Sequence, residues 1–281
     1  MIPNTTKPDA GSLPIPAVQV VDVSKTYRSR NKAVQALMPT SFSVNTGEFV
    51  ALVGPSGCGK STLLMMIAGL RGKTTGTVFV DGASVESPLT DIGIVFQRDL
   101  LMEWHRVMDN ILTQAVFRGI PKDKLRPRAK QLLEMVGLPG VEERYPFELS
   151  GGMRQRVSIC RALVNDPPLL LMDEPFGALD ALTREQMTLD IQDIWSGTGK
   201  TVLFVTHSIS EAVFLADRVL IFGPNPGRVV DDVRIDLPRP RNLAMRAEPE
   251  FAKYTKIIRS RFEEMGVIGG SAVKREGKSA Q

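Results

Sequence analysis

The residues best suited to chemistry form one glycine-rich stretch. It fits the pattern G-x-x-x-x-G-K-[ST] and runs one residue further, over Gly54, Pro55, Ser56, Gly57, Cys58, Gly59, Lys60, Ser61 and Thr62. Glycines let successive backbone N–H groups turn inward around phosphate oxygens. Lys60 would reach the β- and γ-phosphates of a nucleotide, and the Ser61 hydroxyl would bind Mg²⁺. The stretch therefore predicts a nucleoside triphosphate site, with Lys60 in a catalytic role and Ser61 as a metal ligand.

The segments on either side of this loop support that interpretation. An apolar run over 48–53 predicts a buried strand, and 62–68 predicts a helix. The start of a helix adds unpaired N–H groups and the positive end of the helix dipole. The alternative is an ordinary glycine-rich turn. A chance match in a chain of this length is on the order of one per cent, so the strand–loop–helix context favours phosphate binding.

A second apolar run ends in two carboxylates. Residues 169–172 predict a strand, and Asp173 and Glu174 follow it. In a protein with a phosphate loop, Asp173 would hold Mg²⁺, directly or through water, and Glu174 would polarise the attacking water. The alternative is a pair of solvated acids at a strand end.

Two further polar side chains follow predicted strands: Gln97 after 92–96 and His207 after 202–206. Ligands of open α/β sheets bind beyond the carboxyl ends of the strands, so both residues should lie near Asp173. The Gln97 amide could meet Mg²⁺ or the attacking water, and His207 is a candidate catalytic residue. A lone histidine is more often structural or on the surface, and that alternative stays open.

A second candidate phosphate contact is formed by Ser150, Gly151 and Gly152. Ser150 suits a helix N-cap, so the glycine pair would open a helix with bare N–H groups that face a phosphate. A Ser-Gly-Gly helix start is a weak signal by itself, and a plainly capped helix is the alternative.

Composition limits the class of protein. The 281 residues, 43% of them hydrophobic, can bury the core of one large domain or two small ones. The net charge of +4 is too mild to argue for a nucleic-acid partner. Two cysteines do not indicate a disulfide framework, and a reducing cytosol is the simpler interpretation. No apolar run approaches the length of a membrane span.

The ends of the chain differ from its middle. Residues 1–17 are rich in Pro, Thr and Ser, which indicates a flexible lead-in and not an export signal. We expect a core domain over 18–237. In the last part, 238–281, a linker at 238–241 should precede a charged helix over 243–265 and a disordered end.

Within the core, hydrophobic spacing separates strands from helices. Residues 18–23 alternate like an edge strand, and 33–44 predict one or two more strands. From 107 to 138 apolar residues recur at helical spacing, with Pro121 and Pro139 as breaks. This predicts a small helical subdomain, at about 97–165, inserted into an α/β core.

Together these segments resemble the ATP-binding subunit of ABC transporters, over about Val18 to Pro238. The matching residues are Gly54 to Thr62 for the first nucleotide motif, Leu149 to Arg156 for the signature, Leu169 to Glu174 for the second nucleotide motif, Ala178 to Asp180 for the D-loop, Gln97 for the glutamine switch and His207 for the histidine switch. Tyr27 falls where the family places an aromatic ring that stacks on adenine. The fold implied is a P-loop NTPase core of the ABC ATPase type, with an N-terminal antiparallel β part.

Details of the motifs resemble the nitrate/sulfonate/taurine group of importers. Met153 stands where the superfamily signature often has Gln, at a position that does not supply phosphate-facing N–H groups. Residues 101–107 are similar to that group's segment after the glutamine, with Glu103 where Pro is common.

The resemblance implies cofactors and partners beyond what spacing shows. ATP and Mg²⁺ would lie between two copies arranged head to tail, and the dimer would drive a membrane permease at the cytoplasmic face of the inner membrane. A periplasmic or extracellular solute-binding protein would be an indirect partner. An exporter or lipoprotein-release cassette shares every ATP motif and stays open. A nucleic-acid-associated cassette is less favoured, because those usually carry a coiled-coil insertion or two cassettes in one chain.

An apolar cluster follows Gln97 in a segment otherwise placed like a surface loop. It contains Leu100, Leu101, Met102 and Trp104. Exposed apolar patches of this kind tend to be contact sites, and the family resemblance implies that a permease helix docks beside this loop. The alternative is that these side chains pack the subdomain's own core.

Overall fold

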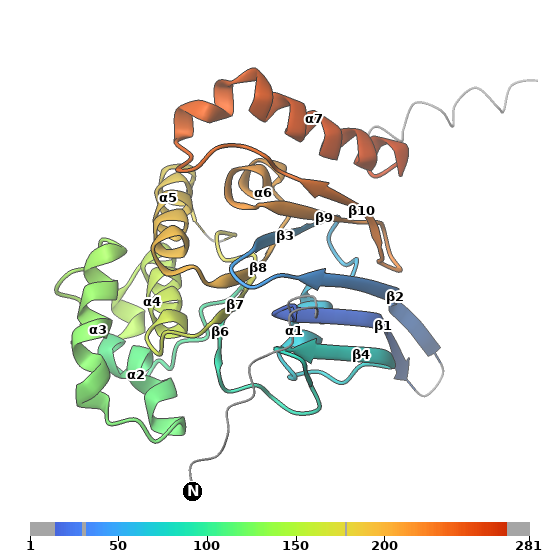
Figure 1. Cartoon of the computed structure of the whole chain (residues 1–281). Helices are drawn as coiled ribbons and strands as arrows, with labels where there is room; N and C mark the ends of the chain where they lie inside the picture. The colour runs from blue at the N-terminus through green and yellow to red at the C-terminus, as the bar shows by residue number, and fades with distance from the viewer. Residues whose placement is uncertain (1–14, 30–31, 178, 269–281) are drawn as a thin grey trace, which may run out of the picture.

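The structure is a computed structural model, and it describes residues 15–29, 32–177 and 179–268. A six-stranded sheet lies at the centre of the molecule (Figure 1), with the spatial order β10-β9-β3-β8-β7-β6. In that order the strands are Val229–Arg234, Arg218–Phe222, Phe49–Val53, Thr201–Thr206, Leu169–Asp173 and Ile92–Val95. All except β10 run parallel. The carboxyl ends of these parallel strands therefore share one edge of the sheet.

The central strands are buried on both faces, which explains their continuous apolar sequences. Every residue of β3, β7 and β8 is buried. In β3, Phe49, Ala51 and Val53 pack into one core cluster. Val50 and Leu52 point the other way, into a second cluster. The alternation along one strand thus divides the hydrophobic core into two layers.

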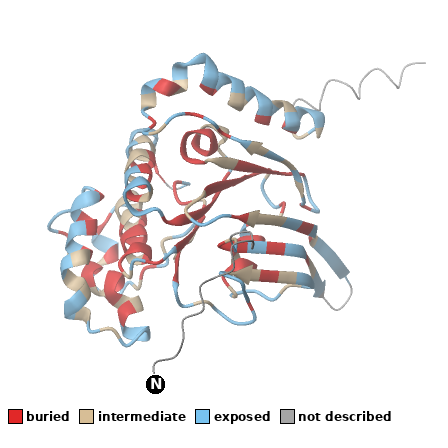
Figure 2. Cartoon of the chain, viewed as in Figure 1, coloured by how far each residue is buried: buried red, intermediate tan, exposed pale blue. Residues whose placement is uncertain are grey.

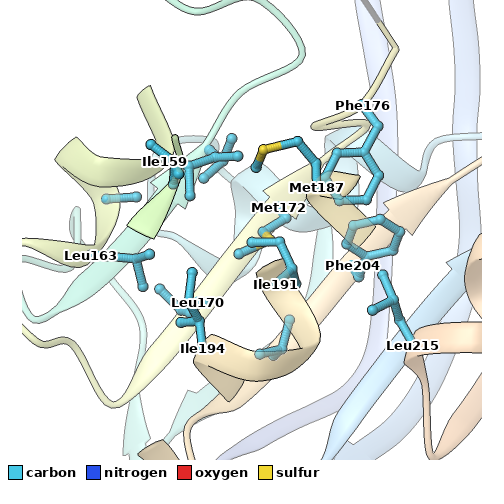
Figure 3. Close-up of a cluster of buried hydrophobic side chains, with 14 of the residues drawn as sticks. Ile159, Leu163, Leu170, Met172, Phe176, Met187, Ile191, Ile194, Phe204 and Leu215 are labelled. Atoms are coloured by element: carbon cyan, nitrogen blue, oxygen red, sulfur yellow. The ribbon is translucent and has the colours of Figure 1, made fainter. Parts of the chain in front are cut away.

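In the first core layer, helix side chains pack against one face of the central sheet. Figure 3 shows Phe176, Met187, Phe204, Met172 and Ile191 gathered in one buried cluster. The Phe176 and Phe204 ring centroids are 5.5 Å apart. Met187 and Ile191 belong to α5, Ala181–Thr198, so this helix is fastened to β7 and β8 by large side chains.

A smaller antiparallel sheet and helix α1, Lys60–Ile67, form the second layer. The sheet order is β2-β1-β4-β5, and the strands are Lys32–Val44, Val18–Ser29, Thr75–Val80 and Ala83–Ser84. The expected antiparallel β part is present, and residues 33–44 form a single strand. The prediction that 18–23 is an edge strand is wrong, because β1 pairs with β2 on one side and β4 on the other. Alternation reports one buried face and says nothing about how many neighbours a strand has.

The helical segment lies at one side of the sheet (Figure 1). Its helices are α2, Val107–Phe117, α3, Lys122–Met135, and α4, Gly151–Leu163, with the 3₁₀ turn η1, Pro146–Glu148, before α4. Buried faces of all three helices meet one another, as Figure 2 shows by the red patches turned inward. All of these elements fall inside the predicted range 97–165.

The last part of the described chain returns to the sheet. Helix α6, Ile209–Leu215, precedes β9, and after β10 come the 3₁₀ turn η2, Leu243–Ala247, and α7, Pro249–Glu264. The helix predicted over 243–265 is interrupted, because Glu248 is extended ahead of Pro249. The predicted linker 238–241 has exposed prolines at 238 and 240 and ends in Arg241, which is 2% exposed, so it is anchored to the core at its last residue. The disordered end predicted over 266–281 is wrong for its first residues, because the Val267 N–H donates to the Phe262 carbonyl at 2.9 Å and Val267 packs against the core. Its remainder from 269 onward, and most of the predicted lead-in, lie outside the described residues.

Among the helices in the described ranges, the structure has none that is both long enough and apolar enough to cross a membrane.

Candidate nucleotide and hydrolysis site

The predicted phosphate loop connects β3 to α1 and is shaped by glycine conformations. Gly57 has φ +77 and Gly59 has φ +97, a region that side-chain-bearing residues rarely adopt. A Cβ on Gly59 would also lie 2.7 Å from the Ala36 carbonyl oxygen. Gly59 is the N-cap of α1 and no side chain caps this helix. The first N–H groups of α1 are therefore free to meet an anion.

Lys60 lies inside this loop, with 4% of its surface exposed. Its Nζ donates to the carbonyl oxygens of Gly54 at 2.9 Å and Pro55 at 3.0 Å. The ammonium group is thus held over the loop that would surround the phosphates, where its charge would be little screened by water.

Ser61 and Asp173 meet at the carboxyl ends of β3 and β7. The Ser61 hydroxyl donates to Asp173 Oδ1 at 2.7 Å. Burial raises the pKa of Asp173, the Ser61 hydrogen bond opposes that rise, and the nearby Glu174 charge adds to it. A hydroxyl and a carboxylate side by side are the oxygen ligands that Mg²⁺ uses together with phosphate oxygens and water. The residues present therefore fit the metal that the sequence predicts.

Glu174 is the point on which the other two polar candidates converge. Its φ of +44 is unusual for a residue with a side chain, and its N–H donates to the Val205 carbonyl at 2.9 Å. Gln97 Nε2 donates to Glu174 Oε2 at 3.0 Å, and His207 Nδ1 lies 3.4 Å from the same oxygen. Three strands thus deliver an amide, a carboxylate and an imidazole to one place.

Tyr27 on β1 lies against the beginning of α1. Its hydroxyl is 3.3 Å from Thr62 Oγ1 and accepts a hydrogen bond from Arg71. The Lys25 ammonium and the Arg71 guanidinium lie 5.2 and 5.6 Å from the ring centroid. Sequence reasoning missed both cations, because neither lies in a recognisable motif and each acts from its own strand or loop.

The Ser-Gly-Gly segment forms a separate part of the surface. Ser150 caps α4, accepting from the Met153 N–H at 3.3 Å, so the predicted helix start is confirmed. Within the described ranges no hydrogen bond or ion pair joins Ser150, Gly151 or Gly152 to the phosphate loop. In the part of the chain that the structure describes, the two predicted phosphate-binding segments are therefore not joined by a direct polar contact.

The N-cap of α5 is a further polar feature near the site. Asp180 Oδ1 accepts from the Thr183 N–H at 3.0 Å, and an Asp directly before a predicted helix is the signal that finds it. Leu179, just before Asp180, is buried and lies close to Gly152. A Cβ on Gly152 would lie 3.3 Å from Leu179 Cδ2.

The apolar cluster after Gln97 divides into two parts. Leu101 is 8% exposed and belongs to the core, as the alternative interpretation holds. Leu100 and Trp104 are 51% and 75% exposed. Leu100 also borders a mostly apolar groove, whose lining includes Leu70, Leu89, Ile92, Ile94, Phe96 and Phe117.

Comparison with known proteins identifies the family. A family model described as ABC transporter matches residues 37–177, which is half of the chain. The chain belongs to the ABC transporter family. The match runs from the second strand through the phosphate loop, the Ser-Gly-Gly helix and the two carboxylates. The predicted fold class and the predicted activity, ATP binding and hydrolysis coupled to transport, are confirmed.

Curated relatives of this ABC cassette cover most of its length. A taurine import ATP-binding protein of Burkholderia pseudomallei is 50% identical over 77% of this chain and 84% of its own. An aliphatic sulfonates import ATP-binding protein of Bacillus cereus is 40% identical over 89% of this chain and 98% of its own. An uncharacterised ABC transporter ATP-binding protein of Methanocaldococcus jannaschii is 46% identical over 86% and 89%.

Among solved structures, an ATP-binding cassette in a dimeric post-hydrolysis state with ADP and Pi is similar. Its TM-score is 0.72 at 32% identity, and the alignment covers 79% of this chain and all of that one.

Proposed function

We propose that this ABC cassette is the ATP-hydrolysing subunit of an importer for taurine, an aliphatic sulfonate, nitrate or a related small solute. The names of several relatives support import over export, since proteins named for taurine or aliphatic sulfonate import match 77% to 89% of the chain. An exporter or lipoprotein-release cassette is the alternative, because the ATP-binding motifs would be the same.

The observation that carries the hydrolytic part is the meeting of Gln97 and His207 on Glu174 Oε2, beside the Ser61–Asp173 pair. A carboxylate held in this way can accept a proton from an attacking water. Gln97 and His207 would fix its orientation, and His207 would also contact the transferred phosphoryl group.

The nucleotide would occupy the surface between Tyr27 and the phosphate loop. The Tyr27 ring would stack on adenine, Lys60 and the loop N–H groups would bind the β- and γ-phosphates, and Ser61, Asp173 and Gln97 would hold Mg²⁺. Bound Mg²⁺ supplies charge that stabilises the phosphates during transfer. The protein's own share is to position these groups before the reaction, which is the main source of catalysis in phosphoryl transfer.

A second copy of the chain would complete each site. Gly151 and Gly152 begin α4, where N–H groups lack partners within the helix, so with Ser150 they suit the γ-phosphate bound by a partner. The similar solved cassette is a dimer in its post-hydrolysis state, which supports this arrangement. ATP would then favour the closed dimer, and hydrolysis would release it.

The groove bordered by Leu100 and Phe117 would receive the permease. It is apolar, it begins a few residues after Gln97, and Phe117 is 85% exposed at its rim. The cassette would thus lie at the cytoplasmic face of the inner membrane, would reach a periplasmic or extracellular solute-binding protein only through the permease, and would need no nucleic acid.

Purification from membranes of the native host tests this proposal. A tagged cassette should bring down integral-membrane permease subunits, and its deletion should abolish ATP-dependent taurine or sulfonate uptake. Normal uptake of these solutes in the deletion strain, with loss of an export activity, would favour the exporter alternative.

A further inference from the structure

A buried carboxylate outside the described site connects two of its segments. Glu211 lies in the first turn of α6, four residues after His207, and is 6% exposed. Burial raises its pKa, while Thr206, Arg184 and other neighbours oppose that rise. A buried acid costs free energy unless its oxygens are well partnered, so its partners are informative.

One oxygen of Glu211 fixes the turn that presents His207. The Thr206 hydroxyl is 2.5 Å from Glu211 Oε2 and accepts the Ser208 N–H at 3.0 Å. The Glu211 N–H in turn donates to Ser208 Oγ at 3.3 Å. The residues on both sides of His207 are therefore fastened to Glu211, while the imidazole extends to Glu174.

The other oxygen of Glu211 faces the segment before α5. Arg184 Nε lies 3.8 Å from Glu211 Oε1, and another guanidinium nitrogen of Arg184 donates to the Leu179 carbonyl at 3.1 Å. Leu179 is the residue that approaches Gly152 at the start of α4. One carboxylate thus joins the His207 turn to the segment that supports the Ser-Gly-Gly helix.

We propose that Glu211 is a positioning residue for ATP hydrolysis, which holds His207 through Thr206 and couples that turn to the Leu179–Asp180 segment through Arg184. This inference deepens the proposed function and rests on it. A displacement of the segment beside the Ser-Gly-Gly helix would then reach the His207–Glu174 pair through the contacts of Glu211 with Arg184 and with Thr206.

The test uses ATP turnover by the assembled transporter, with kcat and KM measured separately. Glu211→Gln keeps the size and an acceptor for Thr206 but loses the charge that attracts Arg184. It should lower kcat roughly 10-fold or more, since small displacements at a reacting centre are costly, and leave KM within about twofold. The matched control is Glu48→Gln, whose carboxylate pairs with Arg218 at 2.8 Å at the opposite end of the sheet. That control should leave kcat unchanged.

A double-mutant cycle separates positioning from general stability and does not depend on Glu211 variants folding well. Thr206→Val and Arg184→Met alter side chains that the described contacts join only through Glu211. If Glu211 couples them, their effects on kcat should be clearly less than multiplicative. Multiplicative effects, or a Glu211→Gln variant with lowered melting temperature but unchanged kcat, would overturn the inference. If the wild-type transporter hydrolyses ATP and Glu174→Gln abolishes that turnover, the proposed ATPase function is supported, whatever the Glu211 variants do. The proposed function and the proposed role of Glu211 can therefore fail separately.

Discussion

Two buried lysines at opposite ends of the central sheet have different kinds of partner. Lys60, at the carboxyl end of β3, donates to the carbonyls of its own loop. Lys200, just before β8, is 6% exposed and binds Asp166 Oδ1 at 2.7 Å and the Pro167 carbonyl at 3.0 Å. The hydrogen bond from Lys200 lowers the pKa of Asp166. Lys200 thus has a carboxylate in direct contact. The described oxygen contacts of Lys60 are backbone carbonyls, and the Asp173 carboxylate acts on its charge only from a longer distance.

The same contrast holds for the rest of the two edges. At the amino end, Arg218 binds Glu48 and Asp232, each at 2.8 Å, and Arg239 binds Asp217. At the carboxyl end the polar groups contact each other: Ser61 with Asp173, and Gln97 and His207 with Glu174. Uncharged side chains that hydrogen-bond to these carboxylates can give up those hydrogen bonds and contact a nucleotide and a metal ion instead. The difference therefore separates ion pairs that hold the fold from the polar groups that we propose take part in the reaction.

The largest expected effect comes from replacing each of the two buried lysines, in turn, by alanine. Lys60→Ala should reduce ATP turnover of the assembled transporter roughly 10²-fold or more, because it removes a cation from the charge that develops on the γ-phosphate. Lys200→Ala is the matched control: it should lower the melting temperature and leave turnover per folded molecule unchanged. Equal losses of turnover in both variants would erase the contrast.

A buried arginine tests the structural end of the sheet. Arg241 donates to five backbone carbonyls, three of them at the end of α6 and all within 3.4 Å. Arg241→Met should cost about 3 kcal/mol of unfolding free energy, since buried acceptors lose their donors. Denaturant unfolding measures this, with Arg234→Met as the control, because the ion pair of Arg234 with Asp236 lies on the exposed surface. An unfolding free energy lowered by less than about 1 kcal/mol, the net contribution of a single hydrogen bond, would contradict this structural role. Weaker ATP binding by the folded variant would show that the role is not purely structural.

The exposed apolar side chains of Leu100 and Trp104, which we propose lie at the permease contact, should give an intermediate effect. Leu100→Asp and Trp104→Asp together should weaken permease association roughly 10-fold or more, because a charge would be buried in an apolar contact. ATP binding by the isolated subunit should be unchanged. Leu101→Asp differs by one position and should instead unfold the subunit, since Leu101 lies in the core. Normal permease co-purification with the exposed pair would place the contact elsewhere.

Tyr27 should give the smallest effect. Tyr27→Ala should weaken ATP binding by about 1–2 kcal/mol, by analogy with aromatic stacking energies. Tyr27→Phe keeps the ring and loses the contacts with Thr62 and Arg71, so it should bind almost normally. Titration of both variants with a fluorescent ATP analogue measures the difference. If the phenylalanine variant loses as much as the alanine variant, the hydroxyl and not the ring binds.

The sequence predicted the carboxyl edge well because each of its residues follows an apolar run. The runs before Gln97, Asp173 and His207 form parallel strands, so their ends had to meet. The amino edge and Glu211 were not predicted, because their partners are brought together by tertiary packing: Arg241 and the Ala216 carbonyl at the end of α6 are 25 residues apart. The central position of β1 was missed for the same reason, since its second neighbour β4 follows only after the phosphate loop and α1.

The most direct test of the account is gel filtration of Glu174→Gln with ATP and Mg²⁺. Gln has nearly the shape of Glu but cannot accept the proton from water, so the variant should bind ATP and not hydrolyse it. The account predicts a stable dimer that contains ATP, whereas the wild-type protein returns to monomer as ATP is consumed. A Glu174→Gln variant that hydrolyses ATP at the wild-type rate and forms no lasting dimer would show that Glu174 is not the residue that activates water.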